Sequence, residues 1–178
     1  MSPRPAVFLD RDGVLNRDRW PTVLRLRALE MLPRAPEAVA LLTKAGWPVF
    51  VATNKTAMGW GLLSQAEHEA IMAKVVDEIT RAGGKVEAVY HCPHPPWVGC
   101  DCHKPKPGML LRAAREHGLD LQRSWMVGDT WRDVRAGKAA GCRTILVGQR
   151  ARDAARLGAD AAAASLWDAA QVILREKP

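Results

Sequence analysis

The sequence lacks the features that mark membrane, secreted and disordered proteins. No apolar run approaches the ~20 residues that a membrane-spanning helix needs. The short run AVFL near the amino terminus is too brief for the core of a signal peptide. Hydrophobic residues make up 48% of the chain and charged residues 25%, values typical of a globular protein. We therefore expect a folded protein in the cytoplasm.

Internal repeats are also missing, and the one low-complexity stretch is the short alanine run DAAAA at 160–164. A length of 178 residues suits one ordinary domain and is too short for two comfortable ones. We expect a single domain over residues 1–178, with an irregular loop at 92–107 inside it.

Acidic residues are outnumbered: 26 Lys and Arg stand against 19 Asp and Glu, which gives a net charge of +7. A basic balance favours anionic partners, namely nucleic acid, acidic lipid or phosphorylated metabolites. The basic residues are scattered along the chain, and much of this charge is consistent with a solubilising surface. Charge alone therefore does not choose among these partners.

Short apolar runs alternate with helical patterns. The runs predict strands over 6–10, 47–53, 86–91, 124–129 and 143–148. The patterns between and after them predict helices over 36–44, 64–81, 107–117, 131–140 and 165–175. Alternating strands and helices form a parallel sheet covered on both faces. The expected fold class is therefore α/β.

Polar and charged residues follow several of these predicted strands. They are Asp10 and Asp12 after the first strand, Thr53, Asn54 and Lys55 after the second, Lys104 and Lys106 after the cysteine-rich loop, and Asp129 and Asp133 after the fourth. Ligands of open parallel sheets bind beyond the carboxyl ends of the strands. We expect these groups to meet at one sheet edge.

Carboxylates gathered in this way repel one another unless a cation lies between them. Hard oxygen ligands in an incomplete protein cage suit Mg²⁺, whose remaining positions go to water and substrate phosphate. An anionic nucleophile can attack phosphate once Mg²⁺ and a lysine neutralise the charge. The inventory therefore predicts phosphoryl transfer, although each residue taken alone is also typical of a turn, a helix cap or the surface.

Cysteines are few, and their positions argue against disulfides. Cys92, His94, Cys100 and Cys102 crowd together, while Cys142 stands alone in an apolar stretch. Cys₃His is a ligand set typical of structural zinc, although the one-residue gaps are tighter than usual and reduced thiols without metal are the alternative. Zinc here would fix the 92–107 loop and hold His103 and Lys104 over the expected site.

The motifs resemble the haloacid dehalogenase (HAD) superfamily of phosphohydrolases over nearly the whole chain. The matching segments are FLDRDGVLN (8–16), VATN (51–54), HKPKPGM (103–109) and GDTWRD (128–133). More narrowly, they resemble its heptose-bisphosphate phosphatase branch, which lies close to the histidinol-phosphatase domain. The resemblance implies a three-layer Rossmann-like core with a central parallel sheet, no large cap domain, and a zinc-binding loop insertion.

The resemblance also implies roles for individual residues. Asp10 would be the nucleophile that forms an aspartyl-phosphate, and Asp12 would act as the general acid and base. Mg²⁺ would be held by Asp10, the backbone carbonyl of Asp12, and Asp129, with Asp133 orienting its surroundings. Thr53 and Lys104 would stabilise the phosphoryl group. The residues implied to contact substrate are Asp18, Arg19, Trp20, Asn54, Lys55, His103 and Thr130.

Three of these positions depart from the branch: Lys55 replaces its glutamine, His103 its arginine and Thr130 its lysine. The catalytic set is intact, but the set that reads the substrate is altered. We predict a Mg²⁺-dependent phosphomonoesterase that releases the 7-phosphate of D-glycero-D-manno-heptose 1,7-bisphosphate. The alternatives are a histidinol-phosphate phosphatase, a nucleic-acid 3′-phosphatase and a non-catalytic zinc-stapled binding module.

The expected partner is a phosphorylated small molecule, and neither nucleic acid nor a membrane is favoured; we expect a monomer. Among the remaining aromatic residues, Trp47 and Trp125 are predicted in the core, while Trp60 and Trp97 fall in loops near the site. His68 lies on a helix pattern and is predicted at the surface.

Overall fold

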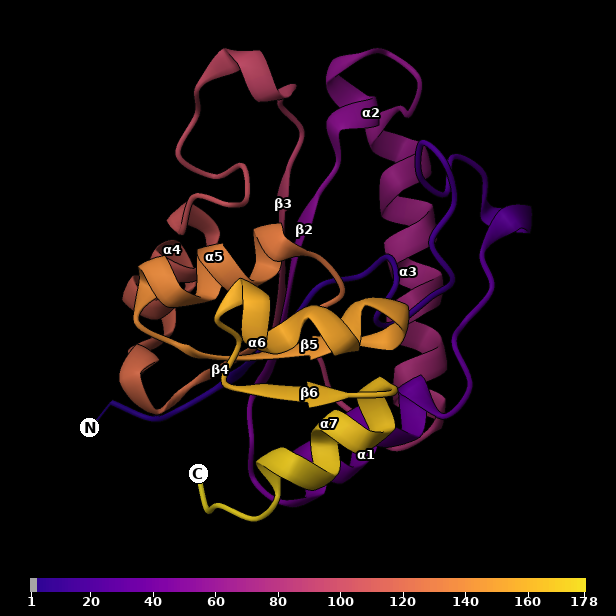
Figure 1. Cartoon of the computed structure of the whole chain (residues 1–178). Coiled ribbons are helices and arrows are strands. Elements are labelled where there is room, and N and C mark those ends of the chain that lie inside the picture. The colour runs from indigo at the N-terminus through magenta and orange to yellow at the C-terminus, as the bar shows by residue number, and fades with distance from the viewer. Residues whose placement is uncertain (1–2) are drawn as a thin grey trace.

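The computed structural model describes residues 3–178, which form a central parallel sheet between layers of helices (Figure 1). The strand order is β3-β2-β1-β4-β5-β6, and every neighbouring pair is parallel. The strands are β1 (Val7–Leu9), β2 (Val49–Asn54), β3 (Ala88–Cys92), β4 (Trp125–Gly128), β5 (Arg143–Val147) and β6 (Ala161–Ala163). This confirms the predicted α/β class and its Rossmann-like order.

Helices cover both faces of the sheet. They are α1 (Ala35–Lys44), α2 (Thr56–Gly59), α3 (Gln65–Arg81), α4 (Gly108–His117), α5 (Trp131–Ala140), α6 (Ala154–Leu157) and α7 (Leu166–Ile173). The core on one face contains side chains of α1, α3 and α7, and the core on the other contains side chains of α4 and α5. The predicted three-layer arrangement is therefore confirmed.

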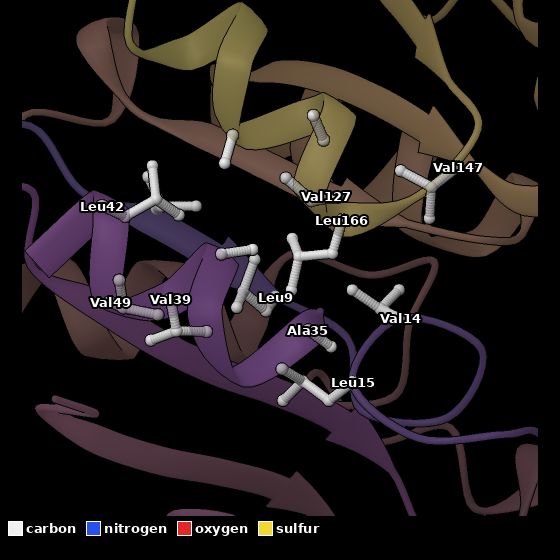
Figure 2. Close-up of a cluster of buried hydrophobic side chains, with 14 of the residues drawn as sticks. Leu9, Val14, Leu15, Ala35, Val39, Leu42, Val49, Val127, Val147 and Leu166 are labelled. Atoms are coloured by element: carbon white, nitrogen blue, oxygen red, sulfur yellow. The ribbon is translucent and has the colours of Figure 1, made fainter. Parts of the chain in front are cut away.

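Successive side chains of β1 point alternately into the two cores. Val7 and Leu9 belong to the cluster beneath α1 and α7, whereas Phe8 belongs to the opposite cluster, where its ring stacks on Phe50 at 5.5 Å. Figure 2 shows Leu9 among the packed side chains of the first cluster, with Leu166 beside it. A strand buried on both faces reads as a continuous apolar run, which is why β1 is visible in the sequence.

The sheet has one strand more than the sequence patterns predict. β6 consists of Ala161–Ala163 and pairs with β5, so the alanine run at 160–164 is in part a short edge strand and no mere low-complexity stretch. Three alanines carry neither β-branched side chains nor an alternating pattern, and nothing local marks them as a strand. Their pairing comes from the sheet beside them.

The segment between β1 and α1 forms no folded lid over the sheet edge. The segment between β1 and α1 contains one short 3₁₀ turn, Leu26–Ala28, in agreement with the predicted absence of a large cap domain. β1 lies at the centre of the sheet between β2 and β4, so the residues after these strands share one edge. Within residues 3–178 no helix is long and apolar enough to cross a bilayer.

Candidate active site

A buried lysine joins two carboxylates at the carboxyl edge of the sheet. Lys104 Nζ lies 3.1 Å from Asp10 Oδ1 and 2.6 Å from Asp133 Oδ1, and it donates a third bond to the carbonyl of Ala52 at 2.7 Å. The Lys104 side chain is only 2% exposed. Its charge therefore acts on Asp10 with little screening by solvent. The neighbouring carboxylates raise the pKa of Lys104 against the opposing effect of burial, so the lysine stays charged.

Asp129 follows β4 and completes a cluster of carboxylates. Oxygen atoms of Asp10, Asp129 and Asp133 all lie within 4.8 Å of one another. Gly13 makes the approach possible: its φ is +78°, and a Cβ there would lie 2.3 Å from Asp129 Oδ2. Burial first, and then the charges of Asp10 and Asp133, raise the pKa of Asp129 to about 8.

This donor set fits Mg²⁺. The donors are hard carboxylate oxygens, and burial together with the charges of Asp10 and Asp133 disfavours the ionised form of Asp129. Asp10, which also lines the cavity described below, has a pKa raised chiefly by its own burial. A divalent ion among these carboxylates would offset their negative charge and favour their ionised forms.

Both carboxylate oxygens of Asp133 accept hydrogen bonds. Oδ1 accepts from Lys104, and Oδ2 accepts from the backbone N–H of Thr130 at 3.0 Å and from its hydroxyl at 2.7 Å. These bonds cap α5 and fix the lysine at the same time. Thr130 lines the cavity, but its hydroxyl is already occupied. Asp133 is therefore placed to support the cluster from behind.

Asp12 turns toward a different set of partners. Its carboxylate accepts from Arg11 at 2.7 Å, Lys55 at 2.5 Å, Asn16 at 2.9 Å and Thr22 at 2.9 Å. Burial opposes the ionisation of Asp12, but the charges of Lys55 and Arg11 outweigh it and hold its pKa well below the usual range. Asp12 is therefore ionised in the free protein. It also lines the cavity.

Lys55 does not lie where the sequence analysis expects it. The predicted substrate contact is 1% exposed, is paired with Asp12, and is absent from the cavity lining. The chain turns into α2 directly after this residue, which directs the side chain back toward the loop after β1. Arg11 is fully buried beside it, and no pattern in the sequence marked either side chain as interior.

Asn54 holds the backbone of Lys104 in place. Its side-chain amide donates to the Lys104 carbonyl at 3.0 Å and accepts from the Lys104 N–H at 3.0 Å. Asn54 also lines the cavity, so the predicted substrate contact has a second, positioning role. Thr53, one residue earlier on β2, is 1% exposed and lines the same cavity, as its implied role requires.

These groups open into a cavity of about 340 Å³. Its wall is formed by Asp10, Asp12, Asp18, Trp20, Pro21, Thr22, Thr53, Asn54, Thr56, Ala57, Trp60, Pro96, His103, Lys104, Asp129, Thr130, Arg132 and Asp133. Among the predicted substrate contacts, Lys55 and Arg19 are missing from this wall, and the Arg19 guanidinium pairs with Glu30 at 3.1 Å. Arg132 does line this wall, although no motif in the sequence marks it as a functional residue.

A second cavity of about 670 Å³ adjoins the first, and Asp18 and Asp129 line both. Three arginines contribute to its wall, namely Arg17, Arg150 and Arg152. Arg17 pairs with Glu30 at 3.0 Å, and Arg150 lies 3.4 Å from Asp129.

The predicted zinc ligands also come together. Cys102 Sγ lies 3.1 Å from Cys92 Sγ, 3.5 Å from Cys100 Sγ and 3.4 Å from His94 Nδ1. The ligand atoms of these residues all lie within 4.8 Å of one another, a donor set and spacing that suit tetrahedral zinc. His103 Nδ1 lies 3.6 Å from Cys92 Sγ, so it borders this cluster as well as the cavity.

The loop that carries these ligands packs against α2. Trp97 stacks on Trp60 with ring centroids 6.4 Å apart, and Pro96 lines the cavity. Gly59 permits the contact, since a Cβ there would lie 2.4 Å from the Cδ of Pro95. The loop therefore forms one wall of the cavity mouth.

Two other expectations have different outcomes. Trp47 and Trp125 are 2% and 4% exposed, as predicted for core residues. The surface prediction for His68 is wrong: it is 2% exposed, and its ring lies 4.4 Å from that of His91. Burial, reinforced by nearby positive groups, lowers the pKa of His68 to about 3.

Carboxylates after the first and fourth strands of a parallel sheet, joined by a buried lysine, define an HAD-type hydrolase. A family model described as HAD-hydrolase-like matches residues 101–169. The chain is 41% identical over 144 residues to the D-glycero-beta-D-manno-heptose-1,7-bisphosphate 7-phosphatase of Pseudomonas aeruginosa, covering 81% of each chain. It is also 41% identical over 141 residues to the Bordetella bronchiseptica protein of that name, covering 79% of each.

Solved structures give the same result. The chain matches a D,D-heptose 1,7-bisphosphate phosphatase from Bordetella bronchiseptica, complexed with magnesium and phosphate, with a TM-score of 0.90 and 36% identity. That match covers 96% of this chain and 98% of the other. The chain belongs to the heptose-1,7-bisphosphate 7-phosphatase family of HAD-like hydrolases, and it is a phosphoric monoester hydrolase.

Proposed function

We propose that this enzyme uses Mg²⁺ to remove the 7-phosphate from D-glycero-D-manno-heptose 1,7-bisphosphate. The observation that carries the proposal is the placement of Asp10, which lines an open cavity, pairs with Lys104 at 3.1 Å and belongs to a cluster of carboxylates. The names and the extensive coverage of the relatives support this choice of substrate.

Asp10 acts as the nucleophile. One carboxylate oxygen attacks the phosphorus atom, the bond between phosphorus and the sugar oxygen breaks, and an aspartyl-phosphate forms. Water then attacks the same phosphorus atom, which releases inorganic phosphate and restores the carboxylate. Lys104 and Thr53 stabilise the negative charge of the transferring group, and the burial of both residues strengthens that effect.

Asp12 moves the protons. It donates one to the departing sugar oxygen in the first step and accepts one from the attacking water in the second. The free protein holds Asp12 ionised between Lys55 and Arg11, which suits the second step. A proton for the first step requires a higher pKa of Asp12, and the negative charge of a bound phosphate would shift the pKa in that direction.

Asp10, the backbone carbonyl of Asp12, and Asp129 would hold the magnesium ion. When bound, Mg²⁺ neutralises the charge between carboxylate and phosphate and aligns the two for attack. Asp133 would support this arrangement indirectly, because hydrogen bonds to Lys104 and Thr130 already occupy both of its oxygens.

The Cys/His cluster of Cys92, His94, Cys100 and Cys102 would hold a structural zinc ion. Cys102, the last of these ligands in the chain, directly precedes His103 and Lys104, two residues of the cavity wall. Zinc would therefore fix the entry of this segment into the site.

The test is a phosphate-release assay with Mg²⁺. Its substrates are both anomers of the heptose bisphosphate, histidinol phosphate, and an oligonucleotide with a 3′-phosphate. We expect the heptose bisphosphate to be hydrolysed with the highest kcat/KM, and Asp10→Asn to abolish release. Asp77→Asn, a substitution in an exposed ion pair of α3, is the matched control.

Preferred hydrolysis of histidinol phosphate or of the oligonucleotide would replace the proposed substrate. Release that survives Asp10→Asn would refute the proposed nucleophile. A failure to hydrolyse any of these compounds, or p-nitrophenyl phosphate, would favour the non-catalytic binding module.

A further inference from the structure

We propose that Arg132 binds the second phosphate of the substrate, the one that is not removed. This inference rests on the proposed function, since only a bisphosphate carries such a group. Arg132 occupies the second position of α5 and lines the same cavity as Asp10. It would make the enzyme selective for bisphosphates over monophosphates.

The charges on the cavity wall single out this residue. The wall carries five carboxylates, those of Asp10, Asp12, Asp18, Asp129 and Asp133. Its permanently charged cations are Lys104 and Arg132. Lys104 is engaged by Asp10 and Asp133 and serves the reacting phosphate. Within residues 3–178 Arg132 has no carboxylate partner at ion-pairing distance. Its guanidinium lies 4.9 Å from the centroid of the Trp131 ring, a contact with the ring face that leaves its N–H donors available to an anionic ligand.

The backbone of Arg132 is held firmly relative to the reacting centre. The neighbouring residue, Asp133, bonds to Lys104 at 2.6 Å, and Thr130 closes the first turn of the helix from the other side. The base of the arginine is therefore fixed one peptide unit away from the carboxylate cluster. Its side chain is exposed and lines the cavity, so the guanidinium is accessible to a group of the substrate that lies away from the reacting phosphate.

The chemistry of the side chain suits this role. A guanidinium group presents paired donors that match two phosphate oxygens, whereas neither a threonine hydroxyl nor an imidazole can do so. His103 and Thr130 line the cavity beside Arg132, and neither carries a permanent positive charge. Arg132 would thus supply the charge that those two positions lack in this chain.

The neighbouring cavity offers the competing location. Arg152 lines that cavity, as do Arg17 and Arg150, both of which already face carboxylates. A substrate reaching from Asp10 into that cavity would have to pass Asp18 and Asp129, the two carboxylates that line both cavities. Arg132 requires no such passage.

The experiment compares kcat/KM for the heptose 1,7-bisphosphate with kcat/KM for p-nitrophenyl phosphate, which has no second phosphate. The holoenzyme is assayed as wild type and as Arg132→Gln, Arg132→Lys, Arg135→Gln and Arg152→Gln. Arg135 lies on the same helix, its guanidinium at 5.0 Å from the Trp131 ring, but it does not line the cavity. It is the matched control.

We expect Arg132→Gln to lower the ratio of the two kcat/KM values by about tenfold or more, mainly through KM for the bisphosphate. Arg132→Lys should retain part of the ratio, and Arg135→Gln and Arg152→Gln should retain the wild-type ratio. A wild-type ratio in Arg132→Gln, or a loss in Arg152→Gln instead, would overturn the assignment.

The proposed function can fail separately from this inference. Wild-type enzyme that hydrolyses p-nitrophenyl phosphate, yet acts no better on the bisphosphate than on the heptose 7-monophosphate, would overturn the role of Arg132 and leave the phosphatase chemistry standing. Wild-type enzyme inactive on every phosphoester would overturn both.

Discussion

The carboxylate cluster draws Asp10, Asp129 and Asp133 from the ends of two strands and the first turn of a helix, whereas the Cys/His cluster comes from β3 and the loop that follows it. Asp10 and Asp133 share a buried internal cation, Lys104, and Asp129 lies 3.4 Å from Arg150. The thiols and imidazole of the other cluster contact chiefly one another. Contacts within the fold thus hold Asp10 and Asp133, whereas the proposed zinc ion would make the Cys/His cluster rigid.

This difference separates what each metal would contribute. The carboxylate cluster keeps its geometry through hydrogen bonds within the protein, so Mg²⁺ would supply mainly chemistry. The 92–107 loop contains only one short 3₁₀ turn, Pro96–Val98, and no residue of that turn is buried. Zinc would therefore supply folding free energy to that loop. The following predictions test this contrast from the largest expected effect to the smallest.

Replacing Lys104 should damage the carboxylate cluster most. Lys104→Met leaves Asp10 and Asp133 buried without their cation, which we expect to cost about 3–5 kcal/mol in the free energy of unfolding. Activity should fall by about 10³-fold or more, because the transferring phosphate loses its nearest positive charge. Urea denaturation and steady-state kinetics measure the two effects.

Lys106→Met is the matched control. Lys106 is exposed and bonds only to the loop, at the carbonyl of Gly99 and at Asp101, so stability should change by less than about 0.5 kcal/mol. Equal effects of the two substitutions on stability and activity would contradict the proposal that Lys104 stabilises the carboxylate cluster and the transferring phosphate.

Removing a zinc ligand should damage the loop and spare the carboxylate cluster. Cys100→Ser should abolish stoichiometric zinc, make residues 92–107 sensitive to protease, and lower the melting temperature by roughly 5–10 °C. Activity should fall about 10-fold through the displaced segment at His103 and Lys104. Metal analysis and limited proteolysis check these effects.

Cys142→Ala provides the comparison, because Cys142 is a buried thiol outside the Cys/His cluster. It should retain zinc and a protected loop. A zinc-free wild-type protein with normal activity and an equally protected loop would show that the ion has no structural role.

Asn54 connects the two regions, because it clamps the backbone of Lys104 where the loop joins the site. Asn54→Ala leaves a partly buried donor and acceptor unpaired, which we expect to cost about 1–3 kcal/mol. Zinc should remain bound while kcat falls. Asn54→Asp, whose side chain accepts but cannot donate, should have a free energy of unfolding between those of wild type and Asn54→Ala. An alanine variant as stable as wild type would contradict the proposed role of Asn54 in holding Lys104.

The effect that is smallest at neutral pH concerns acid stability on the β3 side of the sheet. His68 has a pKa of about 3 in the folded protein, below its ordinary value, so the unfolded chain binds a proton that the native state excludes. Stability contributed by neutral His68 is complete above pH ~6.5 and is lost as the pH falls toward 3, by at most about 1.4 kcal/mol per unit. His68→Gln should flatten the decline in urea midpoint over this range, and an unchanged slope would contradict it.

The sequence predicted the positions that follow from strand ends and short spacings. Asp10, Lys104 and Asp129 meet because parallel strands end at one edge, and the Cys/His cluster is compact because its members are close in the chain. Lys55 could not be placed in this way. Its burial depends on Asp12, a partner 43 positions away. β6 and His68 were missed for the same reason, since neighbouring elements determine both.

The most direct test of the central claim is to trap the phosphoryl group. Wild-type enzyme is mixed with Mg²⁺ and the heptose bisphosphate, quenched in acid during turnover, and reduced with borohydride, which converts an aspartyl-phosphate to homoserine. Peptide mass spectrometry should find homoserine at position 10 and at no other aspartate. Homoserine elsewhere, or none during active turnover, would contradict the proposal that Asp10 is the nucleophile.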